Sequence, residues 1–218
     1  MRESVIGEIL KVKLVAIVRG MEEEFIVPAA NAIRAGGINI LEVTFNQAKP
    51  ESFAATARAV AAVRKAFGSD GFAGAGTVLT ERQLELAAES GAQFIVSPDA
   101  NPLIIRKTRE LGLVSIPGAM TPTECAAAHF AGADFVKLFP LGNLGAAYLK
   151  AIRAPLSHIK FLGVGGINEA NLGEYLAAGA SGFGVGGNLV NKEWIESGKF
   201  DLITGLAAKY VEAVSRAS

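Results

Sequence analysis

The stretch Ala131-Gly132-Ala133-Asp134-Phe135-Val136-Lys137-Leu138-Phe139-Pro140 joins a small-residue phrase to a short apolar run. Glycine in such a phrase is typical of a helix C-cap, because glycine adopts the left-handed conformation without strain. The following run, Phe135–Leu138, is continuously apolar except for Lys137, which is typical of a strand covered on both faces in a parallel sheet. The stretch therefore indicates a helix that ends and a buried strand that begins.

The same unit recurs along the whole chain. Comparable small-residue phrases are Ala35-Gly36-Gly37, Ser90-Gly91-Ala92 and Ala178-Gly179-Ala180. Helix starts are indicated at Thr80-Glu81 and Thr121-Pro122-Thr123-Glu124, since proline is tolerated in a first helical turn. The predicted strands are Leu14–Val18, Ile38–Val43, Phe72–Ala75, Phe94–Ser97, Val114–Ile116, Phe135–Leu138, Lys160–Gly163 and Gly182–Val185.

Eight β–α units with short loops and no linker-like stretch favour a closed (β/α)8 barrel over an open doubly wound sheet. We expect an α/β protein in which residues 1–218 form a single TIM-barrel domain. An extra N-terminal helix, Glu3–Lys11, precedes the first strand, and a C-terminal helix, Leu202–Ser215, follows the last one. No Gly-x-Gly-x-x-Gly opens the first helix of the repeat, so a Rossmann dinucleotide site has no support.

Composition narrows the classes of function. Half of the residues are hydrophobic, which argues against disorder. The 21 basic residues equal the 21 acidic residues in number, so no basic surface indicates a nucleic-acid partner. No apolar run is long enough to span a bilayer, and the N-terminus lacks a signal-peptide core. The single cysteine, Cys125, excludes an internal disulfide and fits a reducing compartment, so we expect a soluble cytoplasmic protein.

Metal ligands are scarce in this sequence. A zinc or iron site usually draws on several His or Cys side chains, and neither His129 nor His158 lies in a ligand-spaced cluster. We expect both histidines to be ordinary surface residues, His129 on a helix and His158 in a turn. No metal and no cofactor are therefore predicted, although a carboxylate-bound magnesium stays open.

Lys137 is a lone cation in an otherwise apolar predicted strand. Burial of an ammonium costs several kcal/mol unless the group is paired or loses its proton. A buried lysine has a lowered pKa, and its free amine can attack a carbonyl carbon and form a Schiff base. The alternative is a lysine at the rim whose stem packs on the core while its head stays in water.

Other polar residues follow the predicted strands, at the end of a barrel where catalytic groups lie. They are Arg19-Gly20, Glu42-Val43-Thr44-Phe45-Asn46, Gly76-Thr77 and Ser97-Pro98. Each is weak evidence alone, because Glu42 can be a rim ion-pair partner and Thr77 a helix cap. Their convergence on one rim with Lys137 favours a catalytic site.

Glycine clusters follow the last two predicted strands, Gly163-Val164-Gly165-Gly166 and Gly184-Val185-Gly186-Gly187-Asn188. Without Cβ atoms a backbone approaches a ligand closely, and its N–H groups can bind phosphate oxygens. Barrels often bind phosphate at the loops after strands seven and eight. The alternative is two tight turns, which explains one glycine in each cluster more easily than a pair. We expect a phosphorylated ligand.

With these residues in this order, the chain resembles the family of 2-keto-3-deoxy-6-phosphogluconate (KDPG) aldolases, which includes 6-phosphogalactonate and 4-hydroxy-2-oxoglutarate aldolases. The resemblance extends from Val15 to Val190, and the Lys-x-Phe-Pro and Gly-Ala-Gly-Thr-Val phrases are its most specific parts. The matching phrases are Leu41-Glu42-Val43-Thr44, Gly74-Ala75-Gly76-Thr77-Val78, Ile95-Val96-Ser97-Pro98, Pro117-Gly118-Ala119-Met120-Thr121-Pro122-Thr123-Glu124, Val136-Lys137-Leu138-Phe139-Pro140 and Gly165-Gly166-Ile167.

The resemblance implies a role for each of these positions. Lys137 would form the Schiff base with the keto group, Glu42 would move protons, and Thr77 would hold the carboxylate of the pyruvate portion. Phe139 and Pro140 would shape the wall, and relatives of this family form homotrimers. The substrate-binding residues predicted in this way are Arg19, Thr44, Asn46, Thr77, Pro98 and Phe139. The predicted phosphate-binding residues are Gly165, Gly166, Gly186, Gly187 and Asn188.

Two positions depart from the family pattern. Many members have an arginine where this chain has Asn46, and Arg19 is the predicted replacement cation, since an arginine fork suits a carboxylate. Asn188 stands where some relatives have a serine near the phosphate.

The predicted function is a class I, metal-independent cleavage of a 2-keto-3-deoxy-6-phospho sugar acid to pyruvate and glyceraldehyde 3-phosphate. One alternative is a phosphate-binding isomerase or epimerase that uses Lys137 and Glu42 as acid and base. Another is a non-catalytic sugar-phosphate binding protein, since barrels host many functions. The gluconate or galactonate configuration, cleavage of 4-hydroxy-2-oxoglutarate and the oligomer interface stay open.

Overall fold

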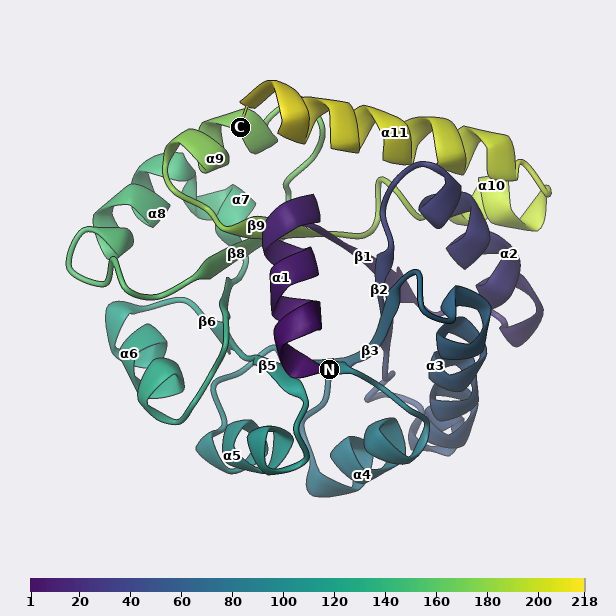
Figure 1. Cartoon of the computed structure of the whole chain (residues 1–218), viewed down its shortest axis with the longest axis horizontal. Coiled ribbons are helices and arrows are strands. Elements are labelled where there is room, and N and C mark those ends of the chain that lie inside the picture. Colours follow the sequence, from purple (N-terminus) through teal and green to yellow (C-terminus); the bar gives the residue numbers. More distant parts are fainter. Residues whose placement is uncertain (218) are drawn as a thin grey trace.

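The computed structural model describes residues 1–217, and its centre is a barrel of nine parallel strands surrounded by helices (Figure 1). The strands are β1 Leu14–Arg19, β2 Ile40–Thr44, β3 Phe72–Gly76, β4 Phe94–Val96, β5 Val114–Ile116, β6 Gly118–Ala119, β7 Val136–Leu138, β8 Phe161–Val164 and β9 Gly182–Val185. The α-helices are α1 Arg2–Val12, α2 Glu23–Ala35, α3 Phe53–Phe67, α4 Glu81–Glu89, α5 Pro102–Glu110, α6 Pro122–Phe130, α7 Leu141–Leu144, α8 Ala146–Arg153, α9 Leu172–Ala177, α10 Lys192–Glu196 and α11 Phe200–Ala217, and a 3-10 helix, η1, covers Pro50–Ser52.

The fifth barrel segment is split by a proline. The strands pair in the order β5-β4-β3-β2-β1-β9-β8-β7-β6. The two edge strands of this sheet, β5 and β6, are separated along the chain only by Pro117. Proline has no N–H to give to a ladder, which accounts for the break. Its carbonyl oxygen still accepts a bond of 2.8 Å from the Lys137 N–H, so this segment connects β4 to β7 and nearly closes the barrel. The predicted parallel α/β barrel is confirmed.

All eight predicted strands are present, with ends that differ by at most two residues. The largest shift is at β2, which begins at Ile40 rather than at Ile38. Ile38 is fully buried in the core between helices and sheet, and a buried turn residue is as apolar as a strand residue. The N-terminal and C-terminal helices are each slightly longer than predicted. The short β6 was not predicted as a separate strand.

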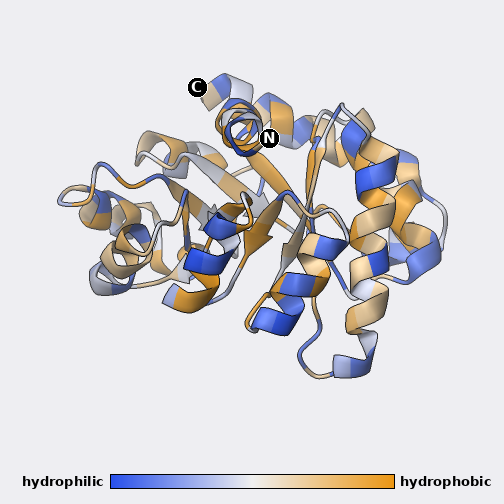
Figure 2. Cartoon of the chain, turned by 60° about the horizontal axis from the view of Figure 1, so that its bottom comes forward, coloured by the Kyte–Doolittle hydropathy of each residue, from blue (hydrophilic) through white to orange (hydrophobic). Residues whose placement is uncertain are grey.

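Two hydrophobic cores lie on the two sides of the sheet. The larger one lies between the strands and the surrounding helices, whose outer faces are polar (Figure 2). The smaller one fills the barrel at the N-terminal ends of the strands. There Val5 and Ile9 of α1 pack against Val15, Phe94 and Val114, and α1 crosses this end of the barrel (Figure 1). Because α1 covers this end, access to the barrel interior is left to the opposite end.

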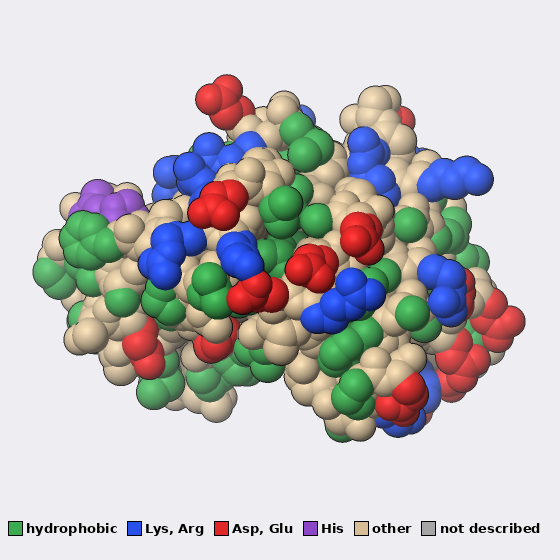
Figure 3. Space-filling view, turned by 90° about the horizontal axis from the view of Figure 1, so that it is seen from below, with side chains coloured by type: hydrophobic (Ala, Val, Ile, Leu, Met, Phe, Trp, Pro, Cys, Tyr) green, Lys and Arg blue, Asp and Glu red, His purple; other side chains and the backbone are tan. Residues whose placement is uncertain are grey.

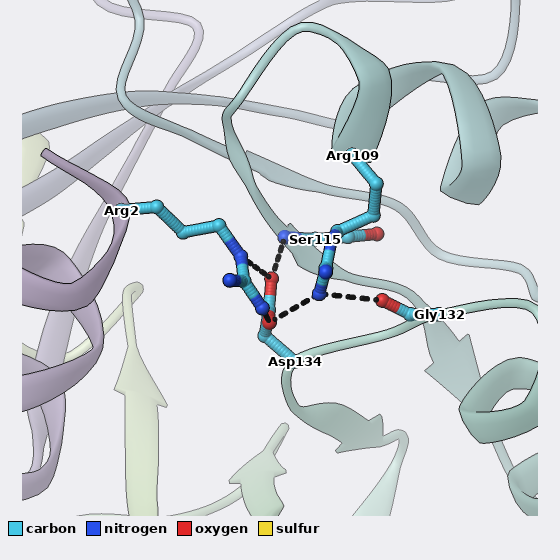
Figure 4. Close-up of polar contacts among 5 residues, drawn as sticks. All are labelled: Arg2, Arg109, Ser115, Gly132 and Asp134. Carbon is cyan, nitrogen blue, oxygen red and sulfur yellow. Dashed lines mark hydrogen bonds and ion pairs between the residues drawn. The ribbon is translucent and has the colours of Figure 1, made fainter.

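A buried carboxylate ties α1 to the barrel wall. The side chain of Asp134 is 3% exposed and forms ion pairs with Arg2 of α1 and Arg109 of α5 (Figure 4). It also accepts a hydrogen bond of 3.0 Å from the Ser115 N–H. Two guanidinium groups and a backbone donor compensate the desolvation of this anion. The network holds the first residues of α1 against the segments around β5 and β7.

The face of the molecule drawn in Figure 3 carries no strong bias of charge. Acidic and basic side chains are interspersed on this face, in keeping with a formal net charge of zero.

His129 lies half-buried on α6 and His158 is exposed in the turn before β8, with their ring centroids 4.8 Å apart. Within residues 1–217, no three His, Cys, Asp or Glu side chains gather in a way that suits a metal ion. In the same range, every helix is too short or too polar to cross a bilayer.

Candidate active site

A cavity of about 560 Å³ opens at the C-terminal ends of the strands. It brings together eleven of the thirteen side chains or glycines that the sequence assigned to the site. The eleven are Arg19, Glu42, Thr77, Pro98, Lys137, Phe139, Gly165, Gly166, Gly186, Gly187 and Asn188. These residues come from segments spread over 170 positions of sequence, so only the closure of the barrel places them around one space.

Lys137 lies in the middle of β7 and is 7% exposed. Burial lowers the pKa of its ammonium group, because the charged form loses its hydration; Glu42 opposes this shift, and Arg19 adds to it. The Nζ atom lies 5.1 Å from the centroid of the Phe139 ring, within the range of a cation–π contact. A lysine in this setting is a free amine at a lower pH than an exposed lysine, which is the form that attacks carbonyl carbons.

Glu42 lies in β2 and is 2% exposed. Burial raises the pKa of its carboxyl group, while Lys137 and Arg19 work against that shift. Burial therefore outweighs the two cations, a balance that the sequence left open. A carboxyl whose pKa is shifted upward both accepts and returns protons more readily near neutral pH than an exposed one does.

The space for the Glu42 side chain is created by a glycine on the neighbouring strand. A Cβ atom at Gly76 of β3 would overlap the Glu42 carboxyl group and lie 2.6 Å from Glu42 Cγ. Gly74, paired with Glu42 in the strand register, likewise leaves room for the Phe94 ring. The glycines of β3 thus decide how the barrel interior is filled. The sequence marked Gly76 only at a strand end and as part of a family phrase, and no local pattern reveals this role.

Arg19 and Thr77 meet across the rim. Nη2 of Arg19 donates a hydrogen bond of 3.4 Å to the Thr77 hydroxyl oxygen. Arg19 is exposed, and its guanidinium can still bind an anion in the cavity. Thr77 has a φ of 57°, a left-handed conformation that β-branched residues rarely adopt. Both residues are thus placed where a carboxylate in the cavity can meet a cation and a hydroxyl.

The two glycine clusters differ from one another. Gly165 and Gly166 have φ angles of 86° and 75°, so a tight turn explains both members of this pair, contrary to the expectation from sequence. The Gly165 carbonyl oxygen accepts a bond of 2.7 Å from the Gly142 N–H, which packs this turn on α7. At Gly187 a Cβ would meet nothing within 4 Å, so packing does not require glycine there.

Thr44 and Asn46 lie outside this cavity. They line a neighbouring one of about 370 Å³ between the segments that carry α2 and α3. Among the described residues the buried Thr44 hydroxyl has no hydrogen-bond partner, and Asn46 Oδ1 accepts a bond from the Ala48 N–H. Their assignment to substrate binding stays a prediction. The wall of the 560 Å³ cavity also includes Ile17, which the sequence presented only as a strand residue. It further includes Val164, Ile167 and Gly184, which the sequence presented as parts of the glycine clusters or of a family phrase and not as site residues.

The chain matches known proteins over most of its length. The model of the family described as KDPG and KHG aldolase matches residues 5–206. A probable 2-dehydro-3-deoxy-6-phosphogalactonate aldolase of Rhizobium meliloti is 38% identical over 177 residues, covering 81% of each chain. A 2-dehydro-3-deoxy-phosphogluconate aldolase of Treponema pallidum is 35% identical over 205 residues, covering 94% of each.

A solved structure of an aldolase is also similar to this chain. It is a KDPG aldolase from Legionella pneumophila with pyruvate captured as a covalent carbinolamine intermediate. It superposes with a TM-score of 0.82 at 30% identity, over 93% of this chain and 96% of that one. The chain described here therefore belongs to the KDPG and KHG aldolase family of class I carbon–carbon lyases.

Proposed function

We propose that this protein cleaves a 2-keto-3-deoxy-6-phospho sugar acid through an imine on Lys137, with Glu42 as the group that moves protons. The observation that carries the proposal is the placement of one buried amine and one buried carboxyl around the same cavity, with their pKa values shifted toward the neutral range. The carbinolamine of the Legionella relative supports it. Among the described residues, Lys137 is the one lysine that lines this cavity.

The proposed reaction uses these groups in the following order. The Lys137 amine attacks the C2 carbonyl carbon, and the carbinolamine loses water to give an iminium. Glu42 takes the proton of the C4 hydroxyl as the C3–C4 bond breaks, and the bonding electrons pass into the iminium to form an enamine. The aldehyde leaves, the enamine is protonated at C3, and hydrolysis releases pyruvate and the free amine. Arg19 and Thr77 would bind the C1 carboxylate and hold the keto acid in a reactive orientation.

The distal phosphate is proposed to lie against the loops after β8 and β9. Gly165, Gly166, Gly186 and Gly187 would offer backbone N–H groups, and Asn188 a side-chain amide. The aldehyde that leaves first would then be glyceraldehyde 3-phosphate, and hydrolysis of the imine would release pyruvate. Since the relatives include both galactonate-type and gluconate-type enzymes, both C4 epimers are candidate substrates.

A coupled assay with lactate dehydrogenase tests this function with each epimer separately. We expect pyruvate release from at least one phosphorylated epimer, with a lower kcat/KM for the same sugar acid without phosphate, because the phosphate contacts are then missing. No pyruvate from either epimer, together with measurable binding of the sugar phosphate, would favour the non-catalytic binding protein. Turnover to an isomeric sugar phosphate would favour the isomerase.

Gly76→Ala is expected to lower cleavage by about 10²-fold, because the new Cβ displaces the Glu42 carboxyl from its place beside the substrate. Gly7→Ala is the matched control, since a Cβ at Gly7 in α1 meets nothing within 4 Å. Steady-state kinetics of the two variants check the prediction. Wild-type turnover in Gly76→Ala would show that Glu42 need not lie where the structure has it.

We further propose that residues 1–218 act as one barrel domain, in the cytoplasm and as a homotrimer. Support comes from the family resemblance for the trimer and from the unpaired, buried Cys125 for a reducing compartment. Light scattering that gives a molar mass other than that of three chains would reject the trimer.

A further inference from the structure

We propose that Gln47 and Gln83 are positioning residues, which hold Thr77 in its left-handed conformation so that its hydroxyl group faces Arg19 and the cavity. The role in substrate binding rests on the proposed function, because the group to be bound is the carboxylate of a keto acid. Neither glutamine lines the cavity. Their action is therefore indirect, through the backbone of the turn that follows β3.

The conformation of Thr77 needs such support. A threonine with a φ of 57° brings its Cβ close to its own backbone, so this conformation costs free energy and persists only where the surroundings impose it. Among residues 1–217, Lys13 is the one other non-glycine residue with positive φ, and it caps the end of α1. Thr77 instead lies at the mouth of the active site.

Hydrogen bonds hold most of the backbone polar groups of this turn. The Thr77 carbonyl oxygen accepts a bond of 2.7 Å from Gln47 Nε2. The N–H groups of Leu79 and Thr80 both donate to Gln83 Oε1, at 2.8 and 3.1 Å. Val78 lies between Thr77 and Leu79. Its N–H donates to the Val96 carbonyl oxygen, and its carbonyl oxygen accepts from the Ser97 hydroxyl. The backbone from Thr77 to Thr80 is thus held from several sides.

The two glutamines form a relay. Gln83 is fully buried in α4, and its Nε2 donates a bond of 3.0 Å to Gln47 Oε1. Because Gln47 Oε1 faces Gln83, its Nε2 faces the Thr77 carbonyl oxygen. The capping box of Thr80 and Gln83 by itself explains why a glutamine stands at Gln83, in the first turn of α4. It does not explain the contact from Gln83 through Gln47 to Thr77, which is the part that reaches the site.

The variant Gln47→Glu tests the relay at an exposed position, where we expect folding to be preserved. An ionised carboxylate cannot donate to the Thr77 carbonyl oxygen, and it repels that oxygen. We expect the concentration of pyruvate that half-saturates imine trapping to rise about 5- to 10-fold, because the loss of one such hydrogen bond weakens binding by about that factor. Trapping at saturating pyruvate should change little. Gln47→Met, which removes the bond without adding charge, is expected to give a similar rise.

Ala48→Glu is the matched control, because it adds the same charge at the next exposed position and leaves the relay intact. The ¹³C chemical shifts of Thr77 in the ligand-free variants supply a readout that does not depend on pyruvate binding or imine formation. We expect these shifts to move away from left-handed values in both Gln47 variants and to stay at wild-type values in Ala48→Glu. Unchanged shifts in the Gln47 variants, or unchanged half-saturation, would overturn the positioning role. If the wild type traps no pyruvate while the Thr77 shifts of the Gln47 variants still change, the proposed function is rejected and the structural relay is retained.

Discussion

Lys137→Met is expected to abolish covalent capture of pyruvate and to lower cleavage by about 10⁴-fold or more, as removal of a covalent nucleophile does in other enzymes. Reduction with borohydride in the presence of pyruvate, followed by peptide mass spectrometry, measures the capture. In the wild type the pyruvate-derived mass increment should lie on Lys137, because the amine lines the cavity and burial lowers its pKa. Lys137→Arg should be equally inactive, since a guanidinium stays protonated.

Lys137→Met should leave the fold intact. Lys137 is 7% exposed, and Met replaces its charged side chain with an apolar one of similar length, so the free energy of unfolding should stay the same or rise. Thermal unfolding monitored by circular dichroism checks this. Lys150→Met, at an exposed lysine of α8, is the control that should keep both capture and turnover. An adduct on another lysine in Lys137→Met would remove Lys137 from its role.

Glu42→Gln has the second-largest expected effect. Loss of the proton-transfer group should lower cleavage by about 10²- to 10⁴-fold, while capture of pyruvate on Lys137 persists, because imine formation requires the amine rather than the carboxylate. Exchange of the pyruvate methyl protons with deuterated solvent, followed by NMR, isolates the proton-transfer step. Glu51→Gln, at an exposed position in η1, is the control for loss of one negative charge. Full exchange in Glu42→Gln would show that another group moves the proton.

The pH dependence of capture gives Glu42→Gln a second, signed readout. The charge of Glu42 raises the pKa of Lys137, in opposition to burial. Removal of that charge lowers the pKa further, so the free amine persists to lower pH. The midpoint of the profile of imine formation against pH should therefore move to lower pH in Glu42→Gln. A shift to higher pH would contradict the electrostatic coupling of the two groups.

Local patterns were sufficient for most of the fold. Each strand was visible as a short apolar run, and each glycine phrase as the end of a helix, because both signals arise from neighbouring residues. The predicted strand Val114–Ile116 ends where β5 does, but the strand after Pro117 was missed, since a two-residue strand such as Gly118–Ala119 has no pattern of its own. Its pairing with β7 depends on a partner that is distant in the sequence.

Residue types and family phrases predicted most of the candidate site, but they did not separate the two cavities. Thr44 and Asn46 follow Glu42 so closely that the sequence grouped all three, whereas the structure places the first two along a different space. Gln47 and Gln83 were not predicted at all. Their relevance depends on hydrogen bonds to a turn 30 residues away from Gln47, which no spacing rule describes.

The sequence by itself determined the succession of strands and helices, and the presence of one amine and one carboxyl at strand positions. Only the tertiary structure decided that the two groups share a cavity and that burial outweighs the surrounding charges for the Glu42 carboxyl. The physical reason is that a pKa depends on the water, charges and dipoles around a group in three dimensions. Those neighbours come from opposite sides of the barrel, so they exist only once it has closed.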